Sequence, residues 1–188
     1  MPLLVAIEGI DGSGKGTQAA LLCRKLRTRG RSVALLSFPR YGETRFGAAV
    51  GAFLDGRFGT LDAVHPQLAA LVFAGDRVES KDVILQADAE NDVLVFDRYV
   101  ASNAAHQAAK LEEAEREPLI RWIEAIEYEV YGIPRADLTV LLDVPATAAQ
   151  RLIAKKSRRP YTDKSVDLQE ADAGYLERVR RVYQALAA

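Results

Sequence analysis

The sequence predicts an α/β fold, in which helices cover both faces of a parallel sheet. Short apolar runs alternate with helical patterns along the 188 residues, and strands joined through helices form right-handed crossovers to parallel neighbours. The apolar runs are continuous rather than alternating, which is typical of strands buried on both faces. The length suits one domain over residues 1–188.

Strands and helices are expected at definite places along the chain. The expected strands span residues 3–8, 31–38, 92–97 and 136–144. The expected helices span about 14–29, 44–54, 66–89, 99–110, 115–131, 145–155 and 169–187. Residues 155–168 are polar, basic and interrupted by Pro160, so we expect a mobile lid over a site.

The bulk composition is that of an ordinary soluble protein, with 49% hydrophobic and 27% charged residues. The net charge of −1 points to no nucleic-acid polymer and no anionic membrane, so any phosphate chemistry must come from local clusters of charge. Cys23 is the only cysteine, which rules out a disulfide within the chain and fits a reducing cytoplasm. No apolar run is long enough to span a membrane, and the start of the sequence is typical of a strand, not of a signal peptide.

The stretch GIDGSGKGT has the spacing of a phosphate-binding loop. Gly9, Gly14 and Lys15 match G-x-x-x-x-G-K, in which backbone N–H groups and a helix N-terminus face phosphate and the lysine adds a full charge. The alternative is a glycine-rich turn that binds no nucleotide, but a strand before it and a helix after it favour a three-layer P-loop NTPase fold. The residues expected to contact ATP here are Gly9, Ile10, Asp11, Gly12, Ser13, Gly14, Lys15, Gly16 and Thr17.

Gly16 departs from the usual loop. Many P-loops have Ser or Thr at this position, where the hydroxyl contacts Mg²⁺. The hydroxyl here belongs to Thr17, about 100° further round the helix. The metal must then rely on nucleotide oxygens, water and carboxylates elsewhere. The stretch GKGTQ resembles adenylate kinases and, more broadly, nucleoside monophosphate kinases, which implies an ATP-type donor and leaves the acceptor open.

Three further stretches narrow the acceptor: FPRY at 38–41, LVFAGDR at 71–77 and DRYVASNAAHQAAK at 97–110. Together with the P-loop, and in this order, they resemble the thymidylate kinases over nearly the whole chain. The resemblance implies a cytoplasmic, Mg²⁺-dependent homodimer that transfers the γ-phosphoryl group of ATP to dTMP, giving dTDP. The alternatives are another nucleoside monophosphate or deoxynucleoside kinase and a non-catalytic nucleotide-binding regulator.

Two arginines are expected at the phosphate of the acceptor. Arg40 and Arg98 follow the ends of the second and third strands, on the edge where open α/β sheets bind ligands. The planar fork of an arginine suits bidentate phosphate contact, whereas an isolated arginine more often forms a surface ion pair. Two arginines opposite a P-loop favour the phosphate role, and the resemblance makes Arg98 catalytic along with Lys15.

Four side chains are expected at the base. Phe73 and Arg77 are four residues apart and share a helix face. Alone, Phe73 reads more readily as a core residue, but the resemblance implies that it stacks on thymine while Arg77 meets a base oxygen. Asn103 and Gln107 offer donors and acceptors near the same base. Phe38, in the FPRY stretch, is also expected among the substrate contacts.

The sugar and the metal are assigned through the resemblance. Asp11 resembles a loop carboxylate near the sugar 3′-hydroxyl and the metal, and Glu170 is expected to approach Mg²⁺ directly or through water. At position 106 the family often has Tyr or Phe beneath the deoxyribose. The smaller, polar His106 either loosens discrimination against ribonucleotides or is a hydrogen-bonded structural histidine, and both readings stay open. Arg151 resembles a residue that packs on adenine.

The lid is expected to supply catalytic charge. Thymidylate kinases resemble one another in providing a basic residue from the P-loop or from the lid, and this loop has Gly12 and Ser13 instead. Such a basic run is often a solvated face. The uncharged loop favours catalysis from the lid, chiefly by Arg158 and Arg159. Four basic residues of the lid crowd five positions at its start: Lys155, Lys156, Arg158 and Arg159.

Overall fold

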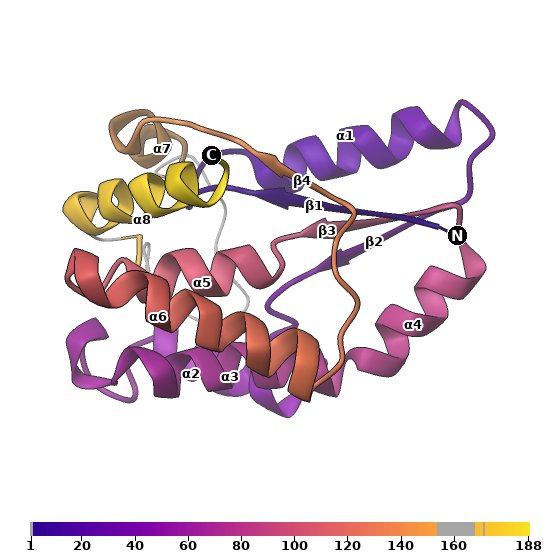
Figure 1. Cartoon of the computed structure of the whole chain (residues 1–188). Coiled ribbons are helices and arrows are strands. Elements are labelled where there is room, and N and C mark those ends of the chain that lie inside the picture. The colour runs from indigo at the N-terminus through magenta and orange to yellow at the C-terminus, as the bar shows by residue number, and fades with distance from the viewer. Residues whose placement is uncertain (1, 154–167, 171) are drawn as a thin grey trace.

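A four-stranded parallel sheet lies at the centre of the computed structural model, which describes residues 2–153, 168–170 and 172–188 (Figure 1). The strand order is β2-β3-β1-β4. The strands are β1 (Leu3–Glu8), β2 (Val33–Ser37), β3 (Val93–Asp97) and β4 (Leu138–Leu141). Asp97 pairs with both Ile7 and Ser37, and Glu8 pairs with Leu141, so the carboxyl ends of all four strands reach one edge.

Helices and short turns connect the strands, as the sequence predicts. In chain order they are α1 (Lys15–Arg27), α2 (Arg45–Leu54), the 3₁₀ turn η1 (Leu61–Ala63), α3 (Pro66–Glu79), α4 (Lys81–Glu90), α5 (Val100–Ala108), α6 (Glu113–Glu124), the π-helical segment η2 (Ala125–Val130), α7 (Ala146–Ile153) and α8 (Ala173–Leu186). None of the helices that the structure describes is long and apolar enough to cross a membrane.

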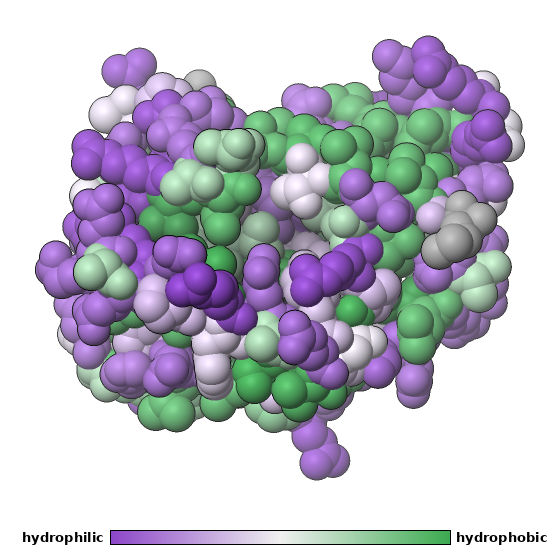
Figure 2. Space-filling view, viewed as in Figure 1, coloured by the Kyte–Doolittle hydropathy of each residue, from purple (hydrophilic) through white to green (hydrophobic). Residues whose placement is uncertain are grey.

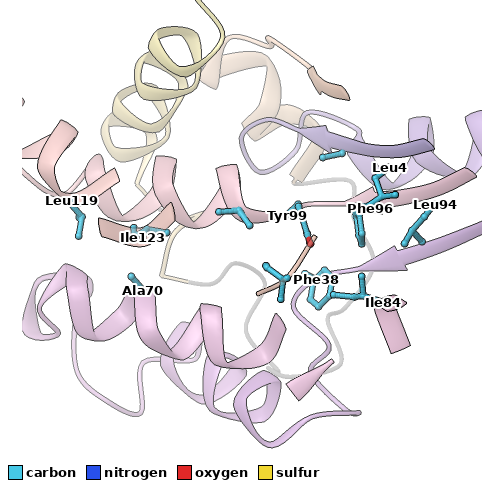
Figure 3. Close-up of a cluster of buried hydrophobic side chains, with 12 residues drawn as sticks. Leu4, Phe38, Ala70, Ile84, Leu94, Phe96, Tyr99, Leu119 and Ile123 are labelled. Atoms are coloured by element: carbon cyan, nitrogen blue, oxygen red, sulfur yellow. The ribbon is translucent and has the colours of Figure 1, made fainter. Parts of the chain in front are cut away.

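The two faces of the sheet bury different clusters, which confirms the predicted three layers. Alternate residues of each strand face opposite ways. Val5 and Val95 face α1, where Ala19 and Cys23 are buried against them. The other face packs against α3, α4 and α6, as the close-up in Figure 3 shows for part of this cluster. Its buried members from the strands are Leu4, Ala6, Leu94 and Phe96.

The edge strand β4 is the least buried of the four. None of its residues is fully buried, and Leu138 is 50% exposed. Figure 2 shows hydrophobic residues at the surface over this edge of the sheet, among a largely polar surround.

The long helix predicted over residues 66–89 is wrong, because the chain breaks at Ser80 into α3 and α4. The Ser80 hydroxyl donates to the Asp76 carbonyl at 2.7 Å, and the Ser80 N–H lies 3.2 Å from the same carbonyl oxygen and 3.1 Å from that of Arg77. A serine that bonds back to the carbonyl four residues earlier bends a helix. The break lets α4 pack under the sheet while α3 extends towards its carboxyl edge (Figure 1).

A second long helix, predicted over 115–131, is α-helical only in its first part. Here α6 ends at Glu124 and continues into η2, whose turns are wider than those of an α-helix. Wider turns of this kind are frequent at functional sites. In this chain η2 carries Glu127, which is fully buried and points back at α3.

A buried carboxylate, Glu8, ties three elements together at the end of β1. The Glu8 side chain is 1% exposed and accepts from the backbone N–H of Tyr99 at 2.7 Å and of Ser102 at 3.2 Å, which caps the start of α5. The hydroxyl of Ser102 donates to it at 2.5 Å and that of Tyr183, in α8, at 3.0 Å. Arg98, just before α5, has a φ of 70°, a conformation that few residues other than glycine adopt.

Replacing Glu8 by alanine is expected to lower the free energy of unfolding by roughly 2–4 kcal/mol, because two buried backbone N–H groups lose their acceptor. Urea unfolding followed by circular dichroism measures this loss. Glu129→Ala, which removes an exposed carboxylate, is the control and should change little. Equal stabilities for the two variants would show that Glu8 is not a structural clamp.

Candidate functional site

The phosphate-binding loop leaves β1 and enters α1 at Lys15, as the sequence predicts. Gly14 precedes the helix with a φ of 89°. At Gly12 the φ is 80°, and a Cβ there would lie 2.3 Å from the Ala149 carbonyl oxygen of α7. The loop therefore packs so closely on α7 that glycine is required at position 12.

A cavity of about 430 Å³ opens beside this loop. Its walls come from the loop and the start of α1, from the end of β3 and from α7, and they carry two cationic and two anionic side chains. The lining residues are Asp11, Gly12, Gly14, Lys15, Gly16, Thr17, Asp97, Arg98 and Leu152. Six of the nine predicted loop residues and Arg98 are thus brought together around one space large enough for the phosphates of a nucleotide, whereas Gly9, Ile10 and Ser13 do not line it.

Lys15 is buried in the wall of this cavity. Its ammonium group donates to the Ile10 carbonyl at 2.7 Å and lies 3.5 Å from the Ser13 hydroxyl. Burial, together with the nearby Arg98, lowers the pKa of Lys15 to about 7, although Asp11 and Asp97 act in the opposite direction. An anion that enters the cavity would restore the charged form.

Arg98 faces the loop from the end of β3. Its guanidinium pairs with Asp11, and NH1 lies 3.1 Å from the Ser102 hydroxyl and 3.4 Å from the Gly9 carbonyl oxygen. Burial alone would lower the pKa of Arg98, but Asp11 and other neighbouring groups more than offset it and raise the pKa. Arg98 is therefore a fixed positive charge at the mouth of the loop.

Asp97 is a site residue that sequence reasoning missed. A Cβ at position 16 would lie 3.0 Å from Asp97 Oδ2, so Gly16 leaves room for this carboxylate at the point where many P-loops have a hydroxyl. The available signal was the strand order, because β3 lies directly beside β1 and its last residue must reach the loop. Asp97 is the first residue of the DRYVASNAAHQAAK stretch, but no role was predicted for it.

The carboxylates of the cavity suit a magnesium ion that also binds a nucleotide. Among the described residues, no group of three or more His, Cys, Asp or Glu side chains gathers. Mg²⁺ commonly takes one or two carboxylates and completes its shell with water and phosphate oxygens. Asp11 and Asp97 provide such a pair. Glu170, also predicted near the metal, is buried and does not line this cavity.

A second charged cluster lies between α3, α5 and η2. Arg77 is buried and donates through Nε and NH2 to the Glu127 carboxylate, at 2.5 Å from NH2 to Oε1. The Asn103 amide nitrogen donates to Glu127 Oε1 at 2.9 Å and to the Ala70 carbonyl at 3.0 Å. Arg77 and Asn103 are thus brought together as predicted, whereas Glu127 was not foreseen.

The remaining residues predicted at the acceptor differ in burial and in their contacts. Phe73 is half-buried, with its ring edge-on to Phe53 at 6.3 Å. Phe38 is in the core, and the Arg77 guanidinium lies 5.9 Å from its ring centre, so it lies behind the arginine. Arg40 pairs with Glu43, and its backbone N–H donates to a buried carboxylate of α3 at 2.9 Å.

His106 and Gln107, both on α5, already have partners. His106 Nε2 lies 3.5 Å from Arg98 NH1, and Nδ1 lies 3.2 Å from the Tyr175 hydroxyl, which donates to the His106 carbonyl at 2.8 Å. Burial, followed by the charge of Arg98, lowers the pKa of His106 to about 3. Gln107 accepts from Lys110 at 2.7 Å. His106 is therefore a neutral residue that contacts Arg98.

The four clustered basic residues of the predicted lid, Lys155, Lys156, Arg158 and Arg159, lie outside the described residues. Arg151, at the end of α7, is exposed. Its predicted contact with adenine stays a prediction.

Comparison with known proteins agrees with this geometry. The sequence model of the thymidylate kinase family matches residues 7–188. A thymidylate kinase of Mycobacterium tuberculosis is 40% identical over 187 residues, which cover 99% of this chain and 86% of the relative. A probable thymidylate kinase of Thermococcus gammatolerans is 34% identical over 192 residues, covering 100% of this chain and 84% of the relative. The solved structure of a Candida albicans thymidylate kinase matches with a TM-score of 0.73 and 25% identity, over 98% of this chain and 77% of that one. The chain belongs to the thymidylate kinase family.

Proposed function

We propose that the protein transfers the γ-phosphoryl group of ATP to dTMP, giving dTDP. The observation that carries this proposal is the pairing of two charged clusters: Lys15, Arg98 and Asp97 around one cavity, and Arg77 with Asn103 at the carboxyl side of the same sheet. The first cluster suits phosphates, and the second presents hydrogen-bonding groups suited to a pyrimidine. Another nucleoside monophosphate kinase would share the first cluster and differ in the second.

The phosphates of ATP lie along the loop from Gly9 to Thr17. Backbone N–H groups and Lys15 bind the β- and γ-phosphates, and Arg151 packs on adenine. Arg98, with Arg40, holds the dTMP phosphate opposite the γ-phosphate, so that the attacking and leaving oxygens lie in line. Phosphoryl transfer needs mainly this alignment and positive charge.

Asp97 and Asp11 would hold Mg²⁺, and the contact of Glu170 with the ion, direct or through water, stays a prediction because Glu170 does not line this cavity. When bound, the ion neutralises charge on the transferred phosphate oxygens. Asp11 also accepts from the sugar 3′-hydroxyl. Its present bond to Arg98 is exchanged for these contacts when the two nucleotides enter.

The base and the sugar of dTMP lie against α3 and α5. Phe73 stacks on thymine, Arg77 donates to the base oxygen, and Asn103 and Gln107 bind the same base. Phe38 contributes by supporting the Arg77 guanidinium, which lies over the Phe38 ring. His106 packs near the sugar and holds Arg98.

The assembly around this activity is also a proposal. We propose a single catalytic domain over residues 1–188, with a lid at about 155–168, in a cytoplasmic homodimer. The lone, buried thiol of Cys23 is compatible with a reducing compartment. The dimer rests on the family likeness, and light scattering in solution tests it.

A panel of acceptors tests the function itself. We expect kcat/KM to fall from dTMP to dUMP and to be far lower for dCMP, because Arg77 can only donate and cytosine places an amino group where thymine has an oxygen. Sites built on hydrogen bonds reject such analogues by up to about 10⁴–10⁵. Arg77→Ala should narrow the difference in kcat/KM between dTMP and dCMP, while Phe73→Ala should lower kcat/KM for all three nucleotides together. A wild-type protein that ignores dTMP would contradict the proposal.

Lys15→Ala should reduce turnover roughly 10²–10³-fold and leave the protein folded, since it removes charge stabilisation from the transition state.

The lowered pKa of Lys15, about 7, predicts that nucleotide binding depends on pH. At pH 8 most free protein carries a neutral Lys15, so MgATP binding should take up a proton and weaken as the pH rises from 7 to 9. Calorimetry in buffers of different ionisation enthalpy measures the uptake, which Lys15→Met should abolish.

The double variant Arg158→Ala/Arg159→Ala should lower kcat more than it raises the KM for dTMP. A contact made mainly in the transition state has this signature. Lys164→Ala, which removes a charge from the same segment, is the control. An unchanged kcat in the double variant would place the catalytic charge elsewhere.

A further inference from the structure

Glu127 is a buried carboxylate that phosphoryl transfer does not use. It is 0% exposed, lies in the π-helical segment η2, and accepts three hydrogen bonds: from Nε and NH2 of Arg77 and from the amide nitrogen of Asn103. It thus contacts two of the three side chains whose polar atoms are proposed to meet the base. A carboxylate costs free energy when it is buried, so a partner on every side indicates a built arrangement.

The contact with Arg77 fixes the direction of its guanidinium. The group is planar and donates through three nitrogens, of which Nε and NH2 face Glu127. Anchoring two nitrogens of a planar fork sets the position of the third, NH1. Burial alone would lower the pKa of Arg77, but Glu127 more than offsets this and raises it, so the donor stays charged.

The contact with Asn103 fixes which way its amide faces. Glu127 Oε1 and the Ala70 carbonyl oxygen can only accept, so the amide atom that lies near both must be the nitrogen. The carbonyl oxygen Oδ1 therefore faces the other way. It is buried and has no hydrogen-bond partner among the described residues. A buried carbonyl without a partner is costly, which favours a ligand that donates to it.

We propose that Glu127 is the positioning residue that sets base specificity, by presenting one donor on Arg77 and one acceptor on Asn103. This inference rests on the proposed function. Thymine and uracil offer an oxygen acceptor at C4 beside an N–H donor at N3, which complements this pair. Cytosine offers a donor at C4 and an acceptor at N3, so both contacts would be mismatched.

The test replaces Glu127 by glutamine, which keeps the size of the side chain and loses the charge and one acceptor. One of the three donors then meets an N–H group instead of an oxygen. We expect the dTMP-to-dCMP ratio of kcat/KM to fall about tenfold or more, mainly through a higher KM for dTMP. The KM for ATP should stay within about twofold, because Glu127 does not line the phosphate cavity. Glu129→Gln, an exposed position on the same segment, is the matched control and should keep the wild-type ratio.

A double-variant cycle separates positioning from general support of the fold. In an Arg77→Ala background, adding Glu127→Gln should change the ratio less than it does in the wild type, because one of the two side chains that Glu127 positions is gone. Thermal unfolding monitors each protein. If Glu127→Gln does not fold, Glu127→Asp keeps the charge, shortens the reach by one methylene, and should shift the ratio in the same direction.

Two results would overturn the inference. One is a folded Glu127→Gln protein with the wild-type ratio, and the other is an equal loss of kcat/KM for dTMP, dUMP and dCMP, which indicates support of the fold alone. Wild-type turnover of dTMP is measured first, so failure of the proposed function would be seen separately.

Discussion

The site depends on a buried carboxylate that does not line its cavity. Glu8 ends the central strand, caps the start of α5 and binds the hydroxyl of Tyr183 in α8. These contacts hold the turn in which Arg98 takes its left-handed backbone conformation and faces the loop. The position of Arg98 is thus set by the sheet, and the end of β1, the start of α5 and the last helix form one frame beside the cavity.

Charges around this frame are buried in local pairs. Arg98 forms an ion pair with Asp11, and Arg77 forms one with Glu127. Lys15 donates to a backbone carbonyl, and its own pKa is lowered. Each arrangement makes a buried cation tolerable before a nucleotide arrives. The pairs differ in purpose: Asp11 lines the cavity and can exchange its partner for a substrate, whereas Glu127 is enclosed and keeps its partner fixed.

Local signals in the sequence predicted the frame and missed its contacts between residues far apart in the sequence. The P-loop and the strands were predictable because their patterns span a few consecutive residues, and the register then places Arg98 at the loop. The break at Ser80 was missed because one side-chain hydrogen bond outweighed a continuous helical pattern. Asp97 and Glu127 were missed because their roles come from contact with elements distant in sequence, as for Arg77 and Glu127, which are 50 positions apart.

The clamp at Glu8 also bears on how the chain matures during synthesis. Glu8 and Tyr183 are 175 residues apart, so the loop is made early and its support closes late. At translation rates of about 5–20 residues per second, roughly ten to thirty-five seconds separate the two ends of the clamp. Tyr99, Ser102 and β4 are all made within that interval, so of the partners of Glu8 only Tyr183 comes at its end. A nascent chain would therefore complete the Glu8 clamp only when α8 has left the ribosome.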